Sequence, residues 1–174
     1  MADASPPSLL GALLDSWARN NTILINLFRA IPDEALSLRP MANSPSIAEL
    51  FAHMHYVRSV FVLEDAPEFS KRLPDEEWVA EPDRERLVHL LTNSAKAVAD
   101  AVRNKVETAR EMNLHYDHPI LMLQHMVWHE GYHHGQIKLA VKAAGRPFDD
   151  EEIGQVTWDV WMKKGRWPPV RPSA

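Results

Sequence analysis

The sequence contains no cysteine and no long apolar run. Without cysteine the chain has no disulfide, no thiolate metal ligand and no cysteine nucleophile, so thiol chemistry here would require a small-molecule thiol. No apolar run approaches the roughly 18 residues needed to span a membrane. The N-terminal segment MADASPPSLL also lacks the basic start and apolar run of a signal peptide. We therefore expect a cytoplasmic protein.

Positive charge is also in deficit, with 19 Lys and Arg against 24 Asp and Glu and a net charge of −5. This balance argues against a protein that binds the phosphate backbone of nucleic acids. The length of 174 residues, 45% of them hydrophobic, predicts one globular domain over residues 1–174 with a sizeable core. Histidine, in contrast, is abundant: six of the nine lie between His115 and His134.

Apolar residues recur at helical spacing in four stretches, and no strand-like alternation competes with them. The first stretch ends near Ile31-Pro32, the second opens with the capping-box pattern Ser46-Ile47-Ala48-Glu49, the third is capped by Asp83, and the fourth runs from about Asp117 to Gly145. The segment from Ala66 to Pro82 reads as a long crossover. A short fifth helix from Glu151 to Lys164 would place Trp158 and Trp161 against the bundle. The predicted fold is an all-α four-helix bundle.

Two histidines of the fourth stretch, His129 and His133, lie one turn apart on its inward face. His53 borders the apolar stripe of the second stretch. An i, i+4 histidine pair and a third histidine on a neighbouring helix predict a metal site with open coordination positions, typical of a catalytic ion. Imidazole ligands suit zinc, nickel, iron or copper, so the ligands alone do not select the divalent ion. We expect zinc or nickel, with iron as a further candidate. A hydrogen-bonded core without metal stays open as the alternative.

The other histidines have different expected places. We expect four of them on the surface or in loops: His55, His89, His115 and His118. His125 and His134 lie a quarter turn to either side of the inward face of the fourth stretch. Trp17, Asn20 and Tyr56 are candidate pocket residues from their places on the helical wheel.

Residues 129–133 read His-Glu-Gly-Tyr-His, the HExxH pattern of zinc proteases in which the glutamate is the general base. The metzincin extension is missing, since Gln136 and Leu139 stand where glycine and histidine are required. Glu151 or Glu152 would have to serve as the downstream ligand of the other protease class, and no strand is predicted to hold a peptide. We therefore disfavour a protease and regard Glu130 as a candidate for proton transfer or for orienting a ligand.

Two sequence blocks, SIAELFAHMHYVR and HEGYHHGQIKLAVKAAGRP, resemble those of the DinB/YfiT-like metal-dependent bundles. That family has a ligand histidine on its second helix and a histidine pair four apart just before Gly-Gln-Ile on its last bundle helix. The matching positions are His53, His129 and His133. Gly135, Gln136 and Ile137 match the trailing motif, although His134 stands where arginine is common.

The resemblance implies a DinB-like bundle of up-down-down-up connectivity, often a homodimer, with a divalent metal ion on three histidines. Characterised relatives in the wider superfamily include transferases and isomerases that use bacillithiol, mycothiol or glutathione. Many members have no established activity, and the family name does not imply DNA repair. The fold locates the site and leaves the substrate undetermined.

The leading hypothesis is a metal-dependent transferase that uses a low-molecular-weight thiol, which would lose its proton at an open metal position. The alternatives are a metal-dependent hydrolase, a non-catalytic metal-binding stress-response protein and a bundle without metal. We expect a small-molecule substrate and a homodimer, with neither nucleic acid nor membrane as a partner.

Overall fold

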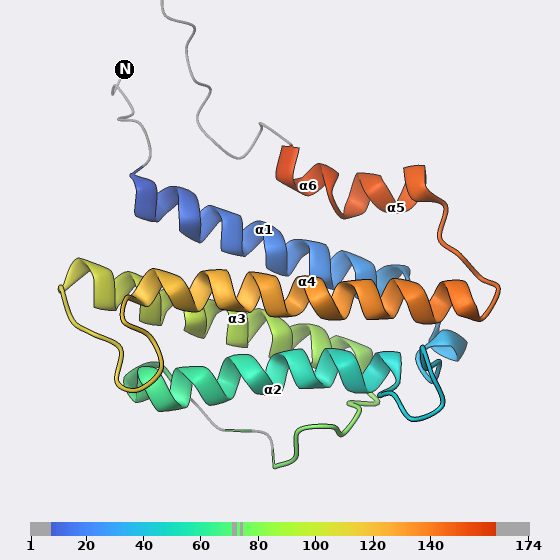
Figure 1. Cartoon of the computed structure of the whole chain (residues 1–174), viewed down its shortest axis with the longest axis horizontal. Helices are drawn as coiled ribbons and strands as arrows, with labels where there is room; N and C mark the ends of the chain where they lie inside the picture. Colours follow the sequence, from blue (N-terminus) through green and yellow to red (C-terminus); the bar gives the residue numbers. More distant parts are fainter. Residues whose placement is uncertain (1–7, 71–72, 74, 163–174) are drawn as a thin grey trace, which may run out of the picture.

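The computed structural model describes residues 8–70, 73 and 75–162, and in this part of the chain all regular structure is helical. Four long helices lie side by side as a bundle (Figure 1). They are α1 (Leu9–Ala30), α2 (Ile47–Asp65), α3 (Arg84–Glu107) and α4 (Pro119–Ala143). The predicted helical bundle is therefore confirmed. None of the described helices combines the length and apolar character needed to cross a membrane.

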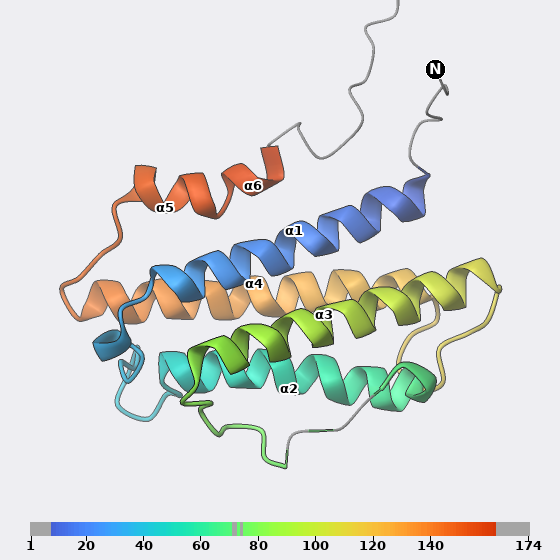
Figure 2. The ribbon, with the colours of Figure 1, turned by 180° about the vertical axis from the view of Figure 1, so that it is seen from behind.

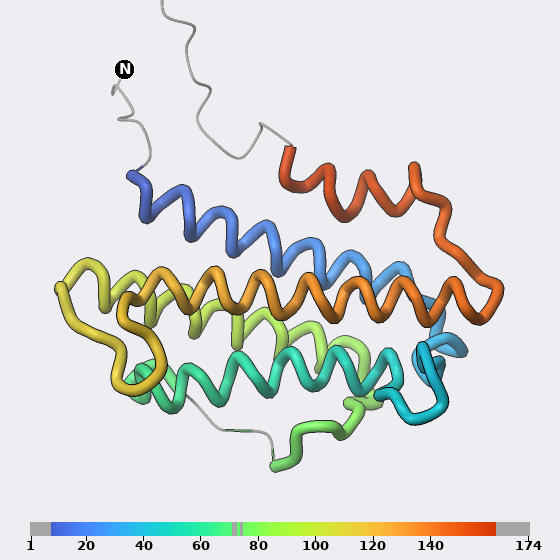
Figure 3. The backbone as a smooth tube through the Cα atoms, viewed as in Figure 1, coloured from blue at the N-terminus to red at the C-terminus, as the bar shows by residue number. Residues whose placement is uncertain are grey.

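The helices α1 and α4 run in one direction along the bundle, and α2 and α3 run in the other (Figures 1 and 3). Because α2 and α3 point the same way, the chain must return along the length of the bundle between them. It does so through the predicted crossover, which includes the short helix η2 (Pro67–Phe69). Figure 2 shows the described residues 75–82 of this segment below α2 and α3. A second short helix, η1 (Asp33–Ala35), lies in the connection between α1 and α2.

The helix ends follow local capping signals. Ser46 and Glu49 form the predicted capping box, with distances of 3.3 Å from the Glu49 amide to Ser46 Oγ and 2.6 Å from the Ser46 amide to Glu49 Oε2. Asp83 caps α3 by accepting from the amide of Arg86. His118 is the cap of α4, and Gly145, at a φ of 73°, ends the last turn in the left-handed region.

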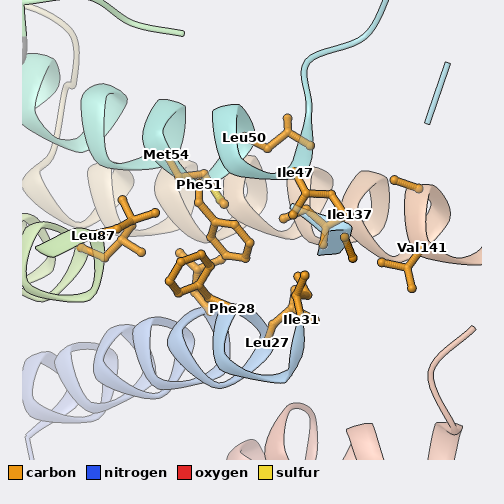
Figure 4. Close-up of a cluster of buried hydrophobic side chains, with 14 of the residues drawn as sticks. Leu27, Phe28, Ile31, Ile47, Leu50, Phe51, Met54, Leu87, Ile137 and Val141 are labelled. Atoms are coloured by element: carbon orange, nitrogen blue, oxygen red, sulfur yellow. The ribbon is translucent and has the colours of Figure 1, made fainter. Parts of the chain in front are cut away.

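The core is formed where the four helices face one another. At one end, the rings of Phe28 and Phe51 meet edge to face with centroids 4.7 Å apart (Figure 4). Trp17, Val98 and Met126 fill the other end. The helix α2 is buried on most sides because the crossover covers the side that faces away from the bundle. The expectation that His55 is solvent-exposed is therefore wrong: its side chain is 8% exposed.

The C-terminal part contains two short helices, α5 (Asp150–Val156) and α6 (Asp159–Met162), where a single helix was expected. Non-helical backbone angles at Thr157 separate them. The indole of Trp158 packs against Gly154, and the Lys138 ammonium lies 5.2 Å from the indole ring. Trp158 and Trp161 are 47% and 41% exposed, so their predicted packing against the bundle is only partial. Lys164, the expected end of this helix, lies outside the described residues.

Candidate metal centre

The three predicted histidines converge between α2 and α4. Nε2 of His129 lies 3.1 Å from Nε2 of His53 and 3.0 Å from Nε2 of His133. One ligand atom from each ring lies within 4.8 Å of the others, a grouping that could hold a metal ion. The i, i+4 spacing on α4 provides two of these rings and the facing turn of α2 provides the third.

All three rings are held in the neutral form. Burial, together with the smaller effects of the neighbouring His133 and His129, lowers the pKa of His53 to about 3. Burial, followed by His133, also lowers the pKa of His129 to about 4. The pKa of His133 is lowered by burial, against the opposing effects of Gln136 and Glu130. Neutral imidazole is the form that binds metal.

Two of the rings have a polar neighbour at Nδ1. Nδ1 of His133 lies 2.7 Å from Oε1 of Gln136, whose amide nitrogen donates to the hydroxyl of Tyr132. Since an amide oxygen only accepts, the proton of His133 resides on Nδ1 and its Nε2 lone pair faces His129. A carboxylate oxygen of Glu77 lies 2.9 Å from Nδ1 of His53, close but outside hydrogen-bond geometry.

The donor set fits a metal ion. Zinc–nitrogen bonds of about 2.0–2.1 Å at a tetrahedral ion place ligand nitrogens about 3.3 Å apart. The two Nε2 separations at His129 are within a few tenths of an ångström of that value. Within the described part of the chain, Nδ1 of His129 is buried without a hydrogen-bond partner. Three neutral rings, two of them buried and that of His129 half-buried, satisfy one another poorly, and a shared cation would use all three Nε2 lone pairs.

The crossover covers one side of this centre. The indole of Trp78 stacks on the ring of His53 at a centroid distance of 3.9 Å and an interplanar angle of 7°. Trp78 and Glu77 could not be predicted from the sequence, because the crossover has no periodicity that would place its side chains. The position of Gln136, three residues after His133, was a signal that could have identified it as a partner of that ring.

The side chain of Glu130 lies in the bundle core and is 2% exposed. Both of its oxygens accept from the guanidinium of Arg58, at 2.5 and 2.8 Å, and one also accepts from the amide nitrogen of Asn20 at 2.6 Å. Arg58 further donates to Asn21 and to the carbonyl of Leu91. Although Glu130 neighbours His129 in sequence, its carboxylate is engaged in an ion pair.

The other candidate residues have contacts of their own, and the ring of His125 lies 6.3 Å from that of His129. Trp17 is buried and lies 4.8 Å from the guanidinium carbon of Arg58, and Tyr56 is half-buried. Nδ1 of His125 lies 2.8 Å from the hydroxyl of Tyr116. As expected, His89, His115 and His118 are exposed.

A cavity of about 580 Å³ lies between the crossover and the helices α2 and α3. Its walls include His55, Val79, Pro82, Arg86 and Leu90, and none of the three converging histidines lines it. The cavity is therefore separate from the candidate metal centre.

The residues that a protease would need do not join the site. Leu139 is exposed on α4, and Glu151 and Glu152 are exposed in the first turn of α5, where their amides donate to Asp149. The described residues include no strand that could hold an extended peptide.

Comparison with known proteins identifies one family. The model of the DinB family matches residues 5–157, which is most of the chain and includes all three histidines. No curated protein and no solved structure matches the sequence.

Proposed function

Because the chain belongs to the DinB family, we propose that it binds one divalent metal ion through His53, His129 and His133 and acts as a transferase with a low-molecular-weight thiol. The observation that carries the proposal is the convergence of three neutral imidazoles on one point. Zinc or nickel suits this all-nitrogen set best, and iron is also compatible. A bound divalent ion would supply a site at which a thiol ionises near neutral pH.

In this proposal the chain's own residues prepare the ligands. Gln136 holds the proton of His133 on Nδ1, so this ring offers Nε2. Such a partner fixes the tautomer and orientation of a metal-binding histidine. The Glu77 carboxylate lies 2.9 Å from Nδ1 of His53 and would favour a proton on that nitrogen. Trp78 limits the motion of His53 and covers one side of the ring.

The engagement of Glu130 favours a thiol transferase over a hydrolase of the zinc-protease type. In such a hydrolase the glutamate of HExxH takes the proton of the attacking water. Here the Glu130 carboxylate binds Arg58 and Asn20 in the core. A thiol of ordinary pKa is already partly ionised near neutral pH, and a nearby cation increases that fraction without a protein base. We assign Glu130 a positioning role: it joins α4 to α2 beside the ligands.

The proposal also includes a small-molecule electrophile as substrate, a cytoplasmic location and a homodimer. The net charge of −5 makes nucleic acid a poor partner.

Activity tests the proposal. Metal-loaded protein is incubated with a panel of electrophiles and glutathione, bacillithiol or mycothiol, and consumption of the thiol is followed. The expected result is consumption that requires the metal and is lost in His133→Ala. Turnover without thiol would identify a hydrolase instead. Metal-loaded protein that consumes no electrophile with any of these thiols would overturn the transferase proposal.

A further inference from the structure

The outer face of α4 has a stripe of large apolar side chains that are exposed to solvent. Leu121, Trp128, Tyr132 and Leu139 are 44%, 72%, 58% and 55% exposed. At 100° per residue these four positions fall within a band about 40° wide. The rings of Trp128 and Tyr132 are stacked on each other with centroids 6.5 Å apart. In Figure 1, α4 lies at the front of the bundle, and α5 and α6 lie beyond α1.

The same face has no exposed charge between Leu121 and Leu139. Its remaining exposed positions there are Gln124, Gly131 and Gly135. The helix α3 differs, because its exposed positions include Glu85, Arg86, Lys96, Arg103 and Glu107. An apolar stripe with aromatic residues and without charge is typical of the centre of a protein interface.

The order of the stripe is self-complementary. Leu121 and Leu139 lie nine residues to either side of position 130, and Trp128 and Tyr132 lie two residues to either side of it. Two copies of α4 placed antiparallel across a two-fold axis level with position 130 therefore pair each Leu121 with a Leu139 and each Trp128 with a Tyr132. An isologous interface requires such a pattern, in which one patch matches itself.

The charges at the two ends of α4 and the two glycines on its exposed face are consistent with this pairing. In the antiparallel arrangement Asp117, before the start of α4, comes beside Lys142, near its end, so opposite charges face each other at both edges. Gly131 and Gly135 are glycines within a helix, where glycine lowers stability. A side chain at either position would meet no atom of the chain, so packing within one copy does not require glycine there. A second helix packed closely against this face would require glycine at these two positions.

We propose that the α4 stripe (Leu121, Trp128, Tyr132 and Leu139) is the interface through which two copies of this chain form an antiparallel, two-fold dimer. The inference deepens the homodimer of the proposed function by naming its surface, and it does not depend on the metal or the thiol. The interface adjoins the metal centre, because Tyr132 accepts from Gln136, which holds His133. The pairing brings Gln124 of the partner subunit opposite Gln136.

Sedimentation of the full-length protein at micromolar concentrations tests the surface. We expect a dimer for the wild type, a monomer for Leu139→Glu and for Trp128→Glu, and a dimer for the control Leu9→Glu. Leu9 is 74% exposed at the start of α1, where an acidic residue is compatible with the helix. Circular dichroism checks that the variants remain helical. A monomeric wild type, or a dimer that persists in both stripe variants, would overturn the proposal.

A cross-link tests the antiparallel pairing without disrupting the surface. The chain has no cysteine, so engineered cysteines have no competing partner. Positions 121 and 139 are about 27 Å apart along one helix, which prevents a disulfide within one copy. Under mild oxidation, the variant with both Leu121→Cys and Leu139→Cys should form a covalent dimer, and either single variant should not. A single variant that cross-links, or a double variant that does not, would overturn the arrangement.

Discussion

The Arg58 guanidinium and the Glu130 carboxylate form a two-point ion pair in the bundle core, with distances of 2.5 and 2.8 Å. Arg58 lies on α2 and Glu130 on α4, the same two helices that carry the three histidines. Both side chains are almost fully buried. The pair therefore fixes the relative placement of the helices that form the candidate metal centre.

Replacing Glu130 with alanine should destabilise the protein by about 3–5 kcal/mol, because Arg58 would then be a buried charge without its carboxylate partner. Urea unfolding measures the change, with Glu151→Ala on the exposed turn of α5 as the control. If Glu130 is a positioning residue, then Glu130→Gln should retain metal stoichiometry. A Glu130→Ala variant as stable as the wild type would contradict the assigned role.

Added zinc or nickel should stabilise the wild type and not the variant His129→Gln. A ligand that binds only the folded state at 100 times its Kd contributes about 2.7 kcal/mol. Thermal unfolding with and without metal measures the shift. His89→Gln, on the exposed side of α3, is the matched control and should respond as the wild type does. Equal shifts in His129→Gln and the wild type would place the metal elsewhere.

Glu77→Gln should weaken metal binding by about 10- to 100-fold, the usual effect of removing the partner of a ligand histidine. The carboxylate faces Nδ1 of His53 at 2.9 Å, and the neutral amide would orient the ring less firmly. Titration with a competing chelator measures the affinity. The neighbouring Glu76 is exposed, and Glu76→Gln should leave the affinity unchanged. Equal affinities in the two variants would remove Glu77 from the site.

The stability of the metal-free protein should fall as the pH is lowered below about 6.5. The pKa values of His53 and His129, about 3 and 4 in the folded protein, lie below the ordinary value of 6.5. The unfolded chain therefore binds more protons between about pH 3 and 6.5, and this contribution to stability is complete only above that range. Urea unfolding at a series of pH values should show a shallower slope in His53→Gln. An unchanged slope would contradict burial of this ring in the neutral form.

The sequence predicted the features that depend on local periodicity. The four long helices, the caps at Ser46 and Asp83, and the choice of His53, His129 and His133 each follow from helical spacing, and the structure brings these three rings together. A resemblance to the DinB-like bundles indicated the same three residues, and the family match confirms the membership.

Features that depend on contacts distant in sequence were not predictable in this way. His55 was expected on the surface because the periodicity of α2 alone does not show the crossover that buries it. Glu130 drew attention as part of HExxH, but its partner Arg58 lies 72 residues earlier in the chain. Trp78 reaches His53 from a segment without periodicity. In each case the environment comes from another element of the fold.

The central claim is that His53, His129 and His133 together bind one metal ion. Elemental analysis of protein purified without a histidine tag and dialysed extensively tests it most directly. We expect close to one divalent ion per chain in the wild type and none in the variant that replaces all three histidines. A wild type that retains no stoichiometric ion, and takes up none when zinc or nickel is added, would contradict it.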